Sequence, residues 1–505
     1  MMYYSRMNKQ FSVLMITSET SPFAKSGGLG EVVPTLAKQL KGRGHDVRIV
    51  MPRYYFIDKT ELEPLDGALG VPVGFGEEWA AVYRTNLPGS DVPLYFIDHE
   101  HLFGRNGIYG PSAAEEYPDN PRRFTLLCRG AFQLCKKLEW VPEVMHAHDW
   151  PAALVPVYLY TWEQSSQFAA TTGILTIHNL GYQGIFQKNE IHTTQLEWQN
   201  YHTSGFEFHE QLNFLQAGIK NADIITTVSP NYAKEIQTPE YGFEMDGILR
   251  HRRGDLFGIL NGIDYEEWNP ETDPYIRYNY SDTAFANKKK VKKLLQKEFK
   301  LPAKEKVPLI GMVSRLADQK GIGSLCGPTY GMLYNMCKDM DLQFVILGSG
   351  ETWCEEELKR LERKLPNLSV VIGFDNQKAH LVEGGSDFFL MPSKYEPCGL
   401  NQMYSLRYGT LPIARRTGGL ADTIENYSRE TGEGTGFLFA DLTPRSIYDS
   451  VGWAVWTYYN RPDDIVKMRK RGMKLRFTWE KSAAGYENLY QWGLDRRLGR
   501  FPRSW

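Results

Sequence analysis

The chain has 505 residues, which is more than one domain of ordinary size, so we expect two or more domains. Its net charge is -2, from 58 basic and 60 acidic residues, which argues against nucleic acid or an anionic membrane as the main partner. No apolar run is long enough to cross a bilayer. The six cysteines contain no C-x-x-C pair, which indicates reduced thiols in a cytosol-like compartment.

The first predicted unit of regular structure lies near the N-terminus. Residues 11–16 read as a strand, residues 32–40 as a helix and residues 44–50 as the next strand, which together make a βαβ unit. The string K-S-G-G-L-G begins at Lys25, between the first strand and the helix. Its glycines let a phosphate approach the backbone at a helix N-terminus, and its lysine supplies a positive charge. A dinucleotide fingerprint fits poorly, because G-x-G-x-x-G is absent.

Two more predicted strands of the first half end in polar side chains. One strand runs into H-A-H-D-W at residues 146–150, and the strand at residues 174–177 is followed by His178. His146 and His148 point the same way on a strand, so a zinc site is conceivable. We disfavour it, because no further His or Cys set at matched spacing completes the site.

The second half carries two cations after a predicted strand. Residues 308–313 read as that strand, and Arg315 and Lys320 follow it, a spacing that suits a diphosphate. Asp339 and Asp341 resemble a metal-binding D-x-D pair. They precede their strand at residues 343–347 instead of following it, so we interpret them as a turn.

A carboxylate follows another predicted strand, at residues 387–391. Glu396 stands a few residues beyond it, Pro397 suits the first position of a helix, and residues 399–408 read as that helix. A second turn of the same kind leads into a helix at residues 417–420. Open α/β sheets bind ligands, anions above all, at such strand ends and helix N-termini.

One predicted helix, within residues 287–300, is rich in lysine. Its apolar residues fall on one face and its lysines opposite. A solvated helix face explains this pattern better than an anionic partner does.

Five strings together resemble the bacterial glycogen synthase and plant starch synthase family, and the resemblance covers nearly the whole chain. They lie at residues 25–29, 146–150, 178–184, 315–321 and 394–422. The resemblance implies the GT-B fold: two doubly wound, Rossmann-like α/β domains facing each other across a cleft. We expect residues 1–264 to form the N-terminal domain, with the tail 485–505 packing back on it, and residues 265–484 to form the nucleotide-sugar domain.

The resemblance also implies an activity. The expected enzyme transfers glucose from ADP-glucose to the non-reducing end of an α-1,4-glucan, with retention and without a metal or other cofactor. The alternatives are a GT-B transferase using UDP-glucose or another acceptor, and an inactive glucan-binding relative. No nucleic acid or membrane is expected as a partner. The expected location is the cytoplasm for a bacterial protein, or the plastid for the mature form of a plant or algal one.

Roles of single residues follow from the same resemblance. The expected catalytic residues are Glu396, Asp149, His178, Arg315, Lys320 and Lys25. The expected donor-binding residues are Lys25, Gly27, Gly28, Arg315, Lys320, Gly373, Phe374, Glu396, Cys398, Gly399, Leu400 and Asn401. The expected sugar contacts are Tyr109, Trp150, Asn179 and Tyr182.

Three details around Glu396 sharpen this expectation. Besides the helix N-terminus, which favours its ionised form, Arg415 and Arg416 are further candidate partners. Some relatives carry a second glutamate eight positions after the first, where this chain has Tyr404. We therefore prefer front-face attack directed by the leaving group over a double displacement. Phe374 keeps the ring, and lacks the hydroxyl, of the tyrosine that the family tends to place against the base.

Overall fold

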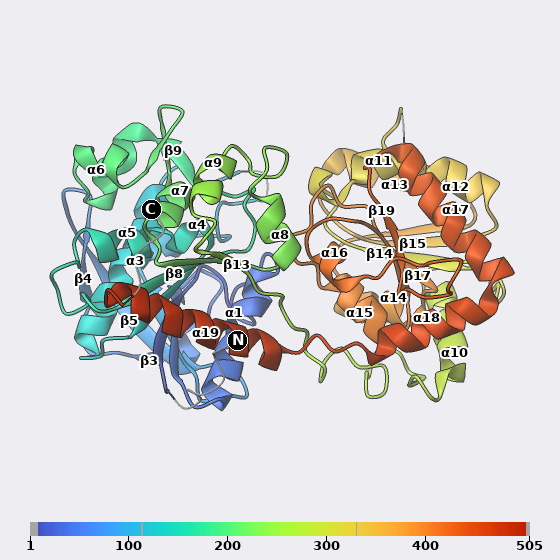
Figure 1. Ribbon diagram of the computed structural model, residues 1–505, viewed down its shortest axis with the longest axis horizontal. Helices are drawn as coiled ribbons and strands as arrows, with labels where there is room; N and C mark the ends of the chain where they lie inside the picture. Colours follow the sequence, from blue (N-terminus) through green and yellow to red (C-terminus); the bar gives the residue numbers. More distant parts are fainter. Residues whose placement is uncertain (1–8, 113–114, 330, 501–505) are drawn as a thin grey trace. The chain divides into compact units, whose positions relative to one another are not determined.

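The computed structural model describes residues 9–112, 115–329 and 331–500, which divide into two compact units (Figure 1). Unit 1 holds the described parts of Met1–Val228, Ala233–Ile259 and Trp479–Trp505, and unit 2 those of Ser229–Tyr232 and Leu260–Thr478. The boundaries expected from the sequence lie a few residues later than these divisions.

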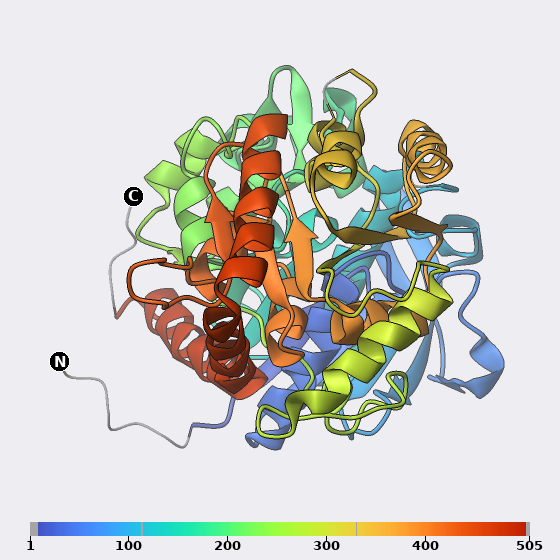
Figure 2. The same ribbon diagram turned by 90° about the vertical axis from the view of Figure 1, so that its right-hand side faces the viewer.

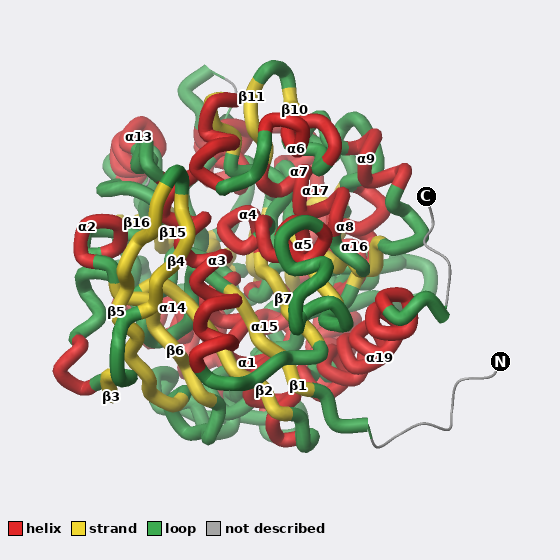
Figure 3. Tube along the Cα trace, turned by 90° about the vertical axis from the view of Figure 1, so that its left-hand side faces the viewer, coloured by secondary structure: helices red, strands yellow, loops and turns green. Residues whose placement is uncertain are grey.

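Unit 1 is built on one large sheet, whose strands are in yellow in Figure 3. The order is β13-β12-β8-β7-β1-β2-β6-β5-β3, with β4 paired to β5. From β13 to β6 all pairs are parallel, whereas β5 runs antiparallel to β6, β3 and β4. The chain winds outward from β1 in both directions, so the order of the strands reverses between β1 and β7.

The strands of this sheet are β1 (Ser12–Ile16), β2 (Asp46–Pro52), β3 (Glu63–Pro64), β4 (Leu69–Val73), β5 (Gly76–Asn86), β6 (Pro93–Asp98), β7 (Val144–His148), β8 (Thr172–Ile177), β12 (Ile224–Thr227) and β13 (Leu256–Gly258). A small separate sheet contains β9 (Ile185–Gln187), β10 (Glu207–Phe208) and β11 (Gln211–Asn213). The helices of unit 1 are α1 (Leu29–Gly42), α2 (Glu100–Phe103), α3 (Asn120–Lys137), α4 (Asp149–Ala152), α5 (Leu154–Tyr160), α6 (Trp198–Thr203), α7 (Phe214–Asn221), α9 (Asp246–His251) and α19 (Trp479–Arg497), with 3₁₀ turns at Lys59–Glu61 and Lys188–Thr194; α8 (Pro230–Glu235) divides between the two units.

The C-terminal helix α19 belongs to unit 1 and packs on α1 and β8. The hydroxyl of its Tyr490 lies 2.9 Å from Nδ1 of the buried His146. One turn earlier in the same helix, the carboxylate of Glu487 accepts two hydrogen bonds from the guanidinium of Arg43, at 2.6 and 2.8 Å. These contacts join the end of the chain to its beginning.

Unit 2 contains a six-stranded, all-parallel sheet of order β16-β15-β14-β17-β18-β19. This is again a doubly wound sheet, and its order reverses between β14 and β17. Its strands are almost wholly buried, as expected for parallel strands covered on both faces. Figure 2 shows α17 in red and α10 in yellow-green on the side of unit 2 that faces the viewer. The expected pair of doubly wound α/β domains is confirmed.

The strands of unit 2 are β14 (Leu309–Val313), β15 (Gln343–Gly348), β16 (Leu368–Ile372), β17 (Phe388–Met391), β18 (Leu411–Arg415) and β19 (Phe437–Phe439). Its helices are α10 (Lys288–Glu298), α11 (Ile322–Cys326), α12 (Leu333–Asp339), α13 (Thr352–Glu362), α14 (Asn376–Gly385), α15 (Asn401–Arg407), α16 (Gly418–Thr423), α17 (Pro444–Asn460) and α18 (Pro462–Lys474), with 3₁₀ turns at Phe285–Asn287 and Asp318–Lys320. Within the described residues, no helix is both long and apolar enough to cross a membrane.

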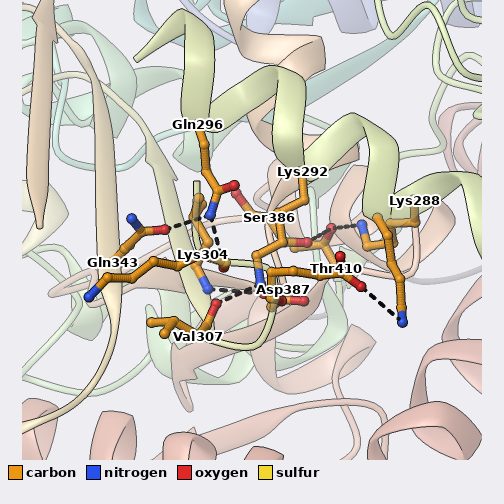
Figure 4. Close-up of polar contacts among 12 residues, drawn as sticks. Lys288, Lys292, Gln296, Lys304, Val307, Gln343, Ser386, Asp387 and Thr410 are labelled. Atoms are coloured by element: carbon orange, nitrogen blue, oxygen red, sulfur yellow. Dashed lines mark hydrogen bonds and ion pairs between the residues drawn. The ribbon is translucent and has the colours of Figure 1, made fainter. Parts of the chain in front are cut away.

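The lysine-rich helix α10 corrects one expectation, because two of its lysines are buried (Figure 4). Nζ of Lys288 donates to the carbonyl oxygens of Gly384 and Tyr408, at 2.9 and 3.0 Å. Nζ of Lys292 forms an ion pair with the buried Asp387 at 2.6 Å. A strip of solvated lysines and a strip of core-directed lysines have the same sequence period, so only the packed structure separates them.

Candidate active site

The switch point of unit 2 brings two predicted site loops together. Arg315 and Lys320 follow β14, and Glu396 follows β17, the neighbouring parallel strand. The two loops lie so close that a Cβ on Gly321 would stand 1.9 Å from the carbonyl oxygen of Pro392. Gly321 also has a positive φ of 71°. A glycine is therefore needed here both for space and for backbone conformation.

Lys320 and Glu396 form an ion pair inside this switch point. Nζ of Lys320 lies 2.6 Å from Oε2 of Glu396, and the hydroxyl of Ser393 donates to the same oxygen at 2.9 Å. The side chain of Glu396 is only 8% exposed, so its charge has little help from water. The ion pair and the hydroxyl supply the stabilisation that solvent does not.

Arg415, a candidate partner of Glu396, also contacts the backbone around the Glu396 loop. Its guanidinium donates to backbone carbonyls, those of Lys394 and Ala440. Arg415 therefore braces the loop that carries Glu396 from outside. The loop after the neighbouring strand β14 supplies Lys320 as an ionic partner of Glu396.

The helix after Glu396 begins later than expected. Helix α15 starts at Asn401, because Gly399 has a left-handed φ of 69° and interrupts the helical path. The side-chain amide of Gln402 donates to the carbonyls of Cys398 and Gly399, at 3.0 and 2.9 Å. The loop Pro397–Leu400 is thus an ordered turn of its own, and Pro397 is not the first residue of the helix.

The second glycine turn supports the first one. The N–H of Gly419 donates to the carbonyls of Glu396 and Pro397, at 3.1 and 3.2 Å. A Cβ on Gly418 would stand 1.9 Å from the carbonyl oxygen of Glu396, and one on Gly419 would stand 2.0 Å from that of Cys398. The start of α16 therefore binds the backbone of the Glu396 loop, although the sequence suggested a second anion site.

The remaining predicted donor residues of unit 2 differ in exposure. Phe374 follows β16 and is 80% exposed, beside Gly373 at a φ of 130°. Cys398 is buried, and burial raises the pKa of its thiol to about 12, so the thiol is uncharged. Asn401 turns its amide toward the carbonyl of Val313, at 3.4 Å. The ring of Phe374 is therefore open to solvent, whereas the thiol of Cys398 is enclosed.

In unit 1, the Lys25 loop is organised by a residue that the sequence did not single out. The carboxylate of Glu19 accepts hydrogen bonds from the backbone N–H groups of Ser26 at 2.6 Å and Gly27 at 3.3 Å. Lys25 itself forms an ion pair with Glu31 and is 40% exposed. Gly28 is the N-cap of α1. A lone Glu in the loop after β1 carries no motif, so nothing local could have identified Glu19.

Asp149 joins the ends of β7 and β8. Its Oδ1 accepts the backbone N–H of His178 at 2.7 Å and that of Asn179 at 3.4 Å. Asp149 has a φ of 57°, an unusual backbone conformation for a residue other than glycine. Burial raises the pKa of the Asp149 carboxyl to about 7. The predicted pair Asp149 and His178 is therefore in direct contact.

Three buried histidines lie on β7 or directly after β8. Nδ1 of His148 is 3.0 Å from Nε2 of His178. His146 is bonded through Nδ1 to Tyr490 and through Nε2 to Thr176, so hydroxyls occupy both of its nitrogens. Burial lowers the pKa of His146 and of His178 to about 3, and that of His148 well below its usual value. Among the residues that the structure describes, no group of three or more His, Cys, Asp or Glu side chains is arranged to hold a metal ion.

The four predicted sugar contacts have different settings. Tyr109 is half-buried, and its hydroxyl donates to Glu19 at 2.6 Å. Trp150 is only 5% exposed and packs edge-to-face on Phe124, so most of its ring surface is buried inside unit 1. The side-chain oxygen of Asn179 accepts the N–H of Gly181 at 3.0 Å. Tyr182 is 48% exposed and presents the most open of the three rings.

The predicted D-x-D pair lies outside both switch points. Asp339 ends α12, and both aspartates precede β15, at the amino end of the sheet of unit 2. Each accepts a tyrosine hydroxyl from α17: Tyr448 donates to Asp339 at 3.0 Å, and Tyr459 to Asp341 at 3.1 Å. This position agrees with the interpretation of the pair as a turn.

Comparison with known families gives matches over both units. Residues 12–251 match the family described as starch synthase catalytic domain. Residues 295–458 match the family described as glycosyl transferases group 1. The two matches cover the loops that carry Lys25, Asp149, Arg315 and Glu396.

Individual relatives are similar over almost their whole length. The chain is 52% identical over 485 residues to a glycogen synthase of Treponema denticola, covering 96% of this chain and 99% of the relative. It is 44% identical over 496 residues to glycogen synthase 1 of Geobacter metallireducens, covering 97% and 98%. Among solved structures, the catalytic domain of starch synthase IV from Arabidopsis thaliana, bound to ADP and acarbose, aligns with a TM-score of 0.87 and 29% identity, covering 97% of this chain and 100% of that one.

Proposed function

This chain belongs to the bacterial glycogen synthase and plant starch synthase family of glycosyltransferases, and from that membership we propose its donor, acceptor and mechanism. The donor is ADP-glucose, and the acceptor is the non-reducing end of an α-1,4-glucan. The starch synthase structure that binds ADP and acarbose supports both choices by analogy. Glucose is transferred with retention of its anomeric configuration.

The observation that carries the proposal is the contact between Lys320 and Glu396 at the switch point of unit 2. When the bond between sugar and phosphate breaks, negative charge grows on the diphosphate and positive charge on the sugar ring. Lys320 and Arg315 stabilise the negative charge on the diphosphate. Glu396 binds the sugar hydroxyls and stabilises the positive charge on the sugar ring. Within unit 1, Lys25 and the N-terminus of α1 offer positive charge to a phosphate group.

Tyr404 supports front-face attack directed by the leaving group. It occupies the position eight residues after Glu396, where a second carboxylate would stand in a double displacement. Its ring stacks on Trp268 with centroids 3.9 Å apart and planes at 8°, and it is 7% exposed. That side chain is committed to packing, so it offers no nucleophile.

No metal or other cofactor is part of this proposal, because Arg315, Lys320 and Lys25 supply the positive charge that a metal would bring. The partners are ADP-glucose and the glucan. The bacterial sources of the relatives favour the cytoplasm of a bacterium over a plastid as the place of reaction. An inactive glucan-binding relative is disfavoured by the complete set of charged residues.

The deciding experiment compares glucose transfer to glycogen from ADP-glucose and from UDP-glucose. We expect turnover with ADP-glucose and little with UDP-glucose. The reverse preference would assign a different donor to the same machinery. Absence of transfer from both sugars, with retained glycogen binding, would favour the inactive relative.

A further inference from the structure

A buried carboxylate in unit 1 joins two parts of the candidate site. Glu19 is 2% exposed and lies in the loop that follows β1, between that strand and the Lys25 loop. Its own backbone is held from both sides: its N–H donates to the hydroxyl of Thr17 at 3.2 Å, and its carbonyl accepts the hydroxyl of Thr20 at 2.8 Å. The backbone that carries the Glu19 side chain is therefore held in place.

Each oxygen of this carboxylate accepts two hydrogen bonds. Oε2 accepts the N–H of Ser26 at 2.6 Å and that of Gly27 at 3.3 Å. Oε1 accepts the hydroxyl of Ser26 at 2.7 Å and that of Tyr109 at 2.6 Å. All four donors are uncharged. A carboxylate that is buried and bonded in this way has one geometry, because each lost bond would leave a desolvated oxygen.

The two ends of this bridge are parts of the candidate site that lie far apart in the sequence. Ser26 and Gly27 directly follow Lys25. Tyr109 lies on the loop after α2, and its hydroxyl is also 2.8 Å from that of Ser18. Burial raises the pKa of Tyr109 well above its usual range, so the hydroxyl keeps its proton and remains a donor to Glu19.

We infer that Glu19 is a positioning residue, which fixes the Lys25 loop against Tyr109 and so holds the lysine where it meets the donor. This inference rests on the proposed function, because it concerns how one proposed donor-binding residue is placed. Glu19 itself does not bind the donor, since its carboxylate is already occupied by four protein donors. Its negative charge would also repel a diphosphate, so its contribution is to geometry.

The test is a double-mutant cycle between Glu19→Ala and Lys25→Ala. Alone, Glu19→Ala should lower kcat by about a hundredfold, the size of effect that a displacement of about 1 Å can cause. In the Lys25→Ala background, Glu19→Ala should have little further effect, because the lysine that Glu19 positions is already absent. Equal losses in both backgrounds would overturn the inference.

Two further variants separate positioning from a merely structural role. Glu19→Gln can keep the bridge, with its oxygen toward Ser26 N and its amide toward the two hydroxyls, so it should recover most of kcat. Ser18→Ala removes the other contact of the Tyr109 hydroxyl and should remain close to wild type. If kcat of Glu19→Ala, corrected for the folded fraction, equals that of wild type, then Glu19 serves stability alone.

Binding of ADP provides a readout without turnover. Calorimetry should give weaker ADP binding for Glu19→Ala than for wild type, and the same binding for Glu19→Ala/Lys25→Ala as for Lys25→Ala. This comparison stands even if wild type prefers another sugar donor, so failure of the inference is distinguishable from failure of the proposed function. Unchanged ADP affinity in Glu19→Ala would contradict the positioning role.

Discussion

The ammonium of Lys320 lies 2.6 Å from Oε2 of Glu396, joining the loop after β14 to the loop after β17. The lysine side chain is 19% exposed and the glutamate side chain 8%. Removing one partner of a buried pair leaves the other charge without compensation, which costs about 3–5 kcal/mol when both are fully buried. Because Lys320 keeps some exposure, we expect less than that here. The pair thus couples the chemistry of the site to its stability.

Glu396→Gln should lose most of kcat while ADP still binds. The substitution keeps the shape and removes the charge that opposes the positive sugar ring, whereas ADP is held by other groups. Kinetics of the Gln and Ala variants, together with ADP calorimetry and melting temperatures, test this. A Gln variant with near-normal turnover would show that Glu396 acts only as a hydrogen-bond acceptor. Equal losses of melting temperature in Gln and Ala, with normal kcat in the folded fraction, would indicate a structural role.

Arg315→Ala and Lys320→Ala should each lower kcat more than they raise KM. They meet charge that grows only as the bond to phosphate breaks, and removing one such group costs about 3 kcal/mol, or roughly a hundredfold. In measurements of melting temperature, each variant serves as the control for the other. Lys320→Ala should also lower the melting temperature, because Glu396 loses its cation, whereas the exposed Arg315 should not. A rise in KM for the donor at constant kcat would mean simple binding.

The rate should rise with pH through about 7 because of Asp149. Burial raises the pKa of its carboxyl to about 7, so below that pH the carboxyl is protonated and cannot stabilise a positive sugar. Asp149→Asn should lower the rate and remove this limb of the kcat/KM profile. The buried His178, whose pKa is about 3, stays neutral through this range and adds no limb. An unchanged limb in Asp149→Asn would assign it to another group.

Acid should destabilise unit 1 through its buried histidines. Burial lowers the pKa of His146 and His178 to about 3, so below pH 6.5 the unfolded chain binds protons that the folded chain cannot. The contribution of each such histidine to stability therefore falls as pH falls, with a slope that approaches about 1.4 kcal/mol per pH unit well below pH 6.5. The carboxyl of Asp149, whose pKa is raised to about 7, acts in the opposite direction, because the folded chain binds its proton first. Urea unfolding at pH 7 and 5.5 measures the slope. Relative to wild type, His146→Gln should lose less stability on acidification, whereas the control His209→Gln, at a side chain that is 69% exposed, should behave like wild type.

Chelation should leave glucose transfer nearly unchanged. The proposed mechanism places arginine and lysine side chains where a metal would otherwise neutralise the diphosphate. Transfer rates measured with and without EDTA test this directly. A rate that collapses with EDTA and recovers with Mg²⁺ or Mn²⁺ would refute the metal-free mechanism. That result would also make Asp339 and Asp341 candidate metal ligands.

The sequence by itself determined the doubly wound architecture and the strand ends that carry the site. Short apolar runs such as residues 309–313 and 388–391, bounded by turn residues, are typical of parallel strands covered on both faces, and this pattern is local. The positions of Arg315, Lys320 and Glu396 after such strands were therefore predictable. The family resemblance assigned their roles.

Only the tertiary structure decided which side chains pair. Glu396 pairs with Lys320, which is 76 positions away in the sequence. Glu19 reaches Tyr109 across 90 positions, and Lys288 turns into the core of unit 2. Strand order sets these pairings, because residues distant in the chain meet where neighbouring strands end. Local patterns carry no information about that order, so they could neither predict the buried ion pair nor distinguish a buried lysine from a solvated one.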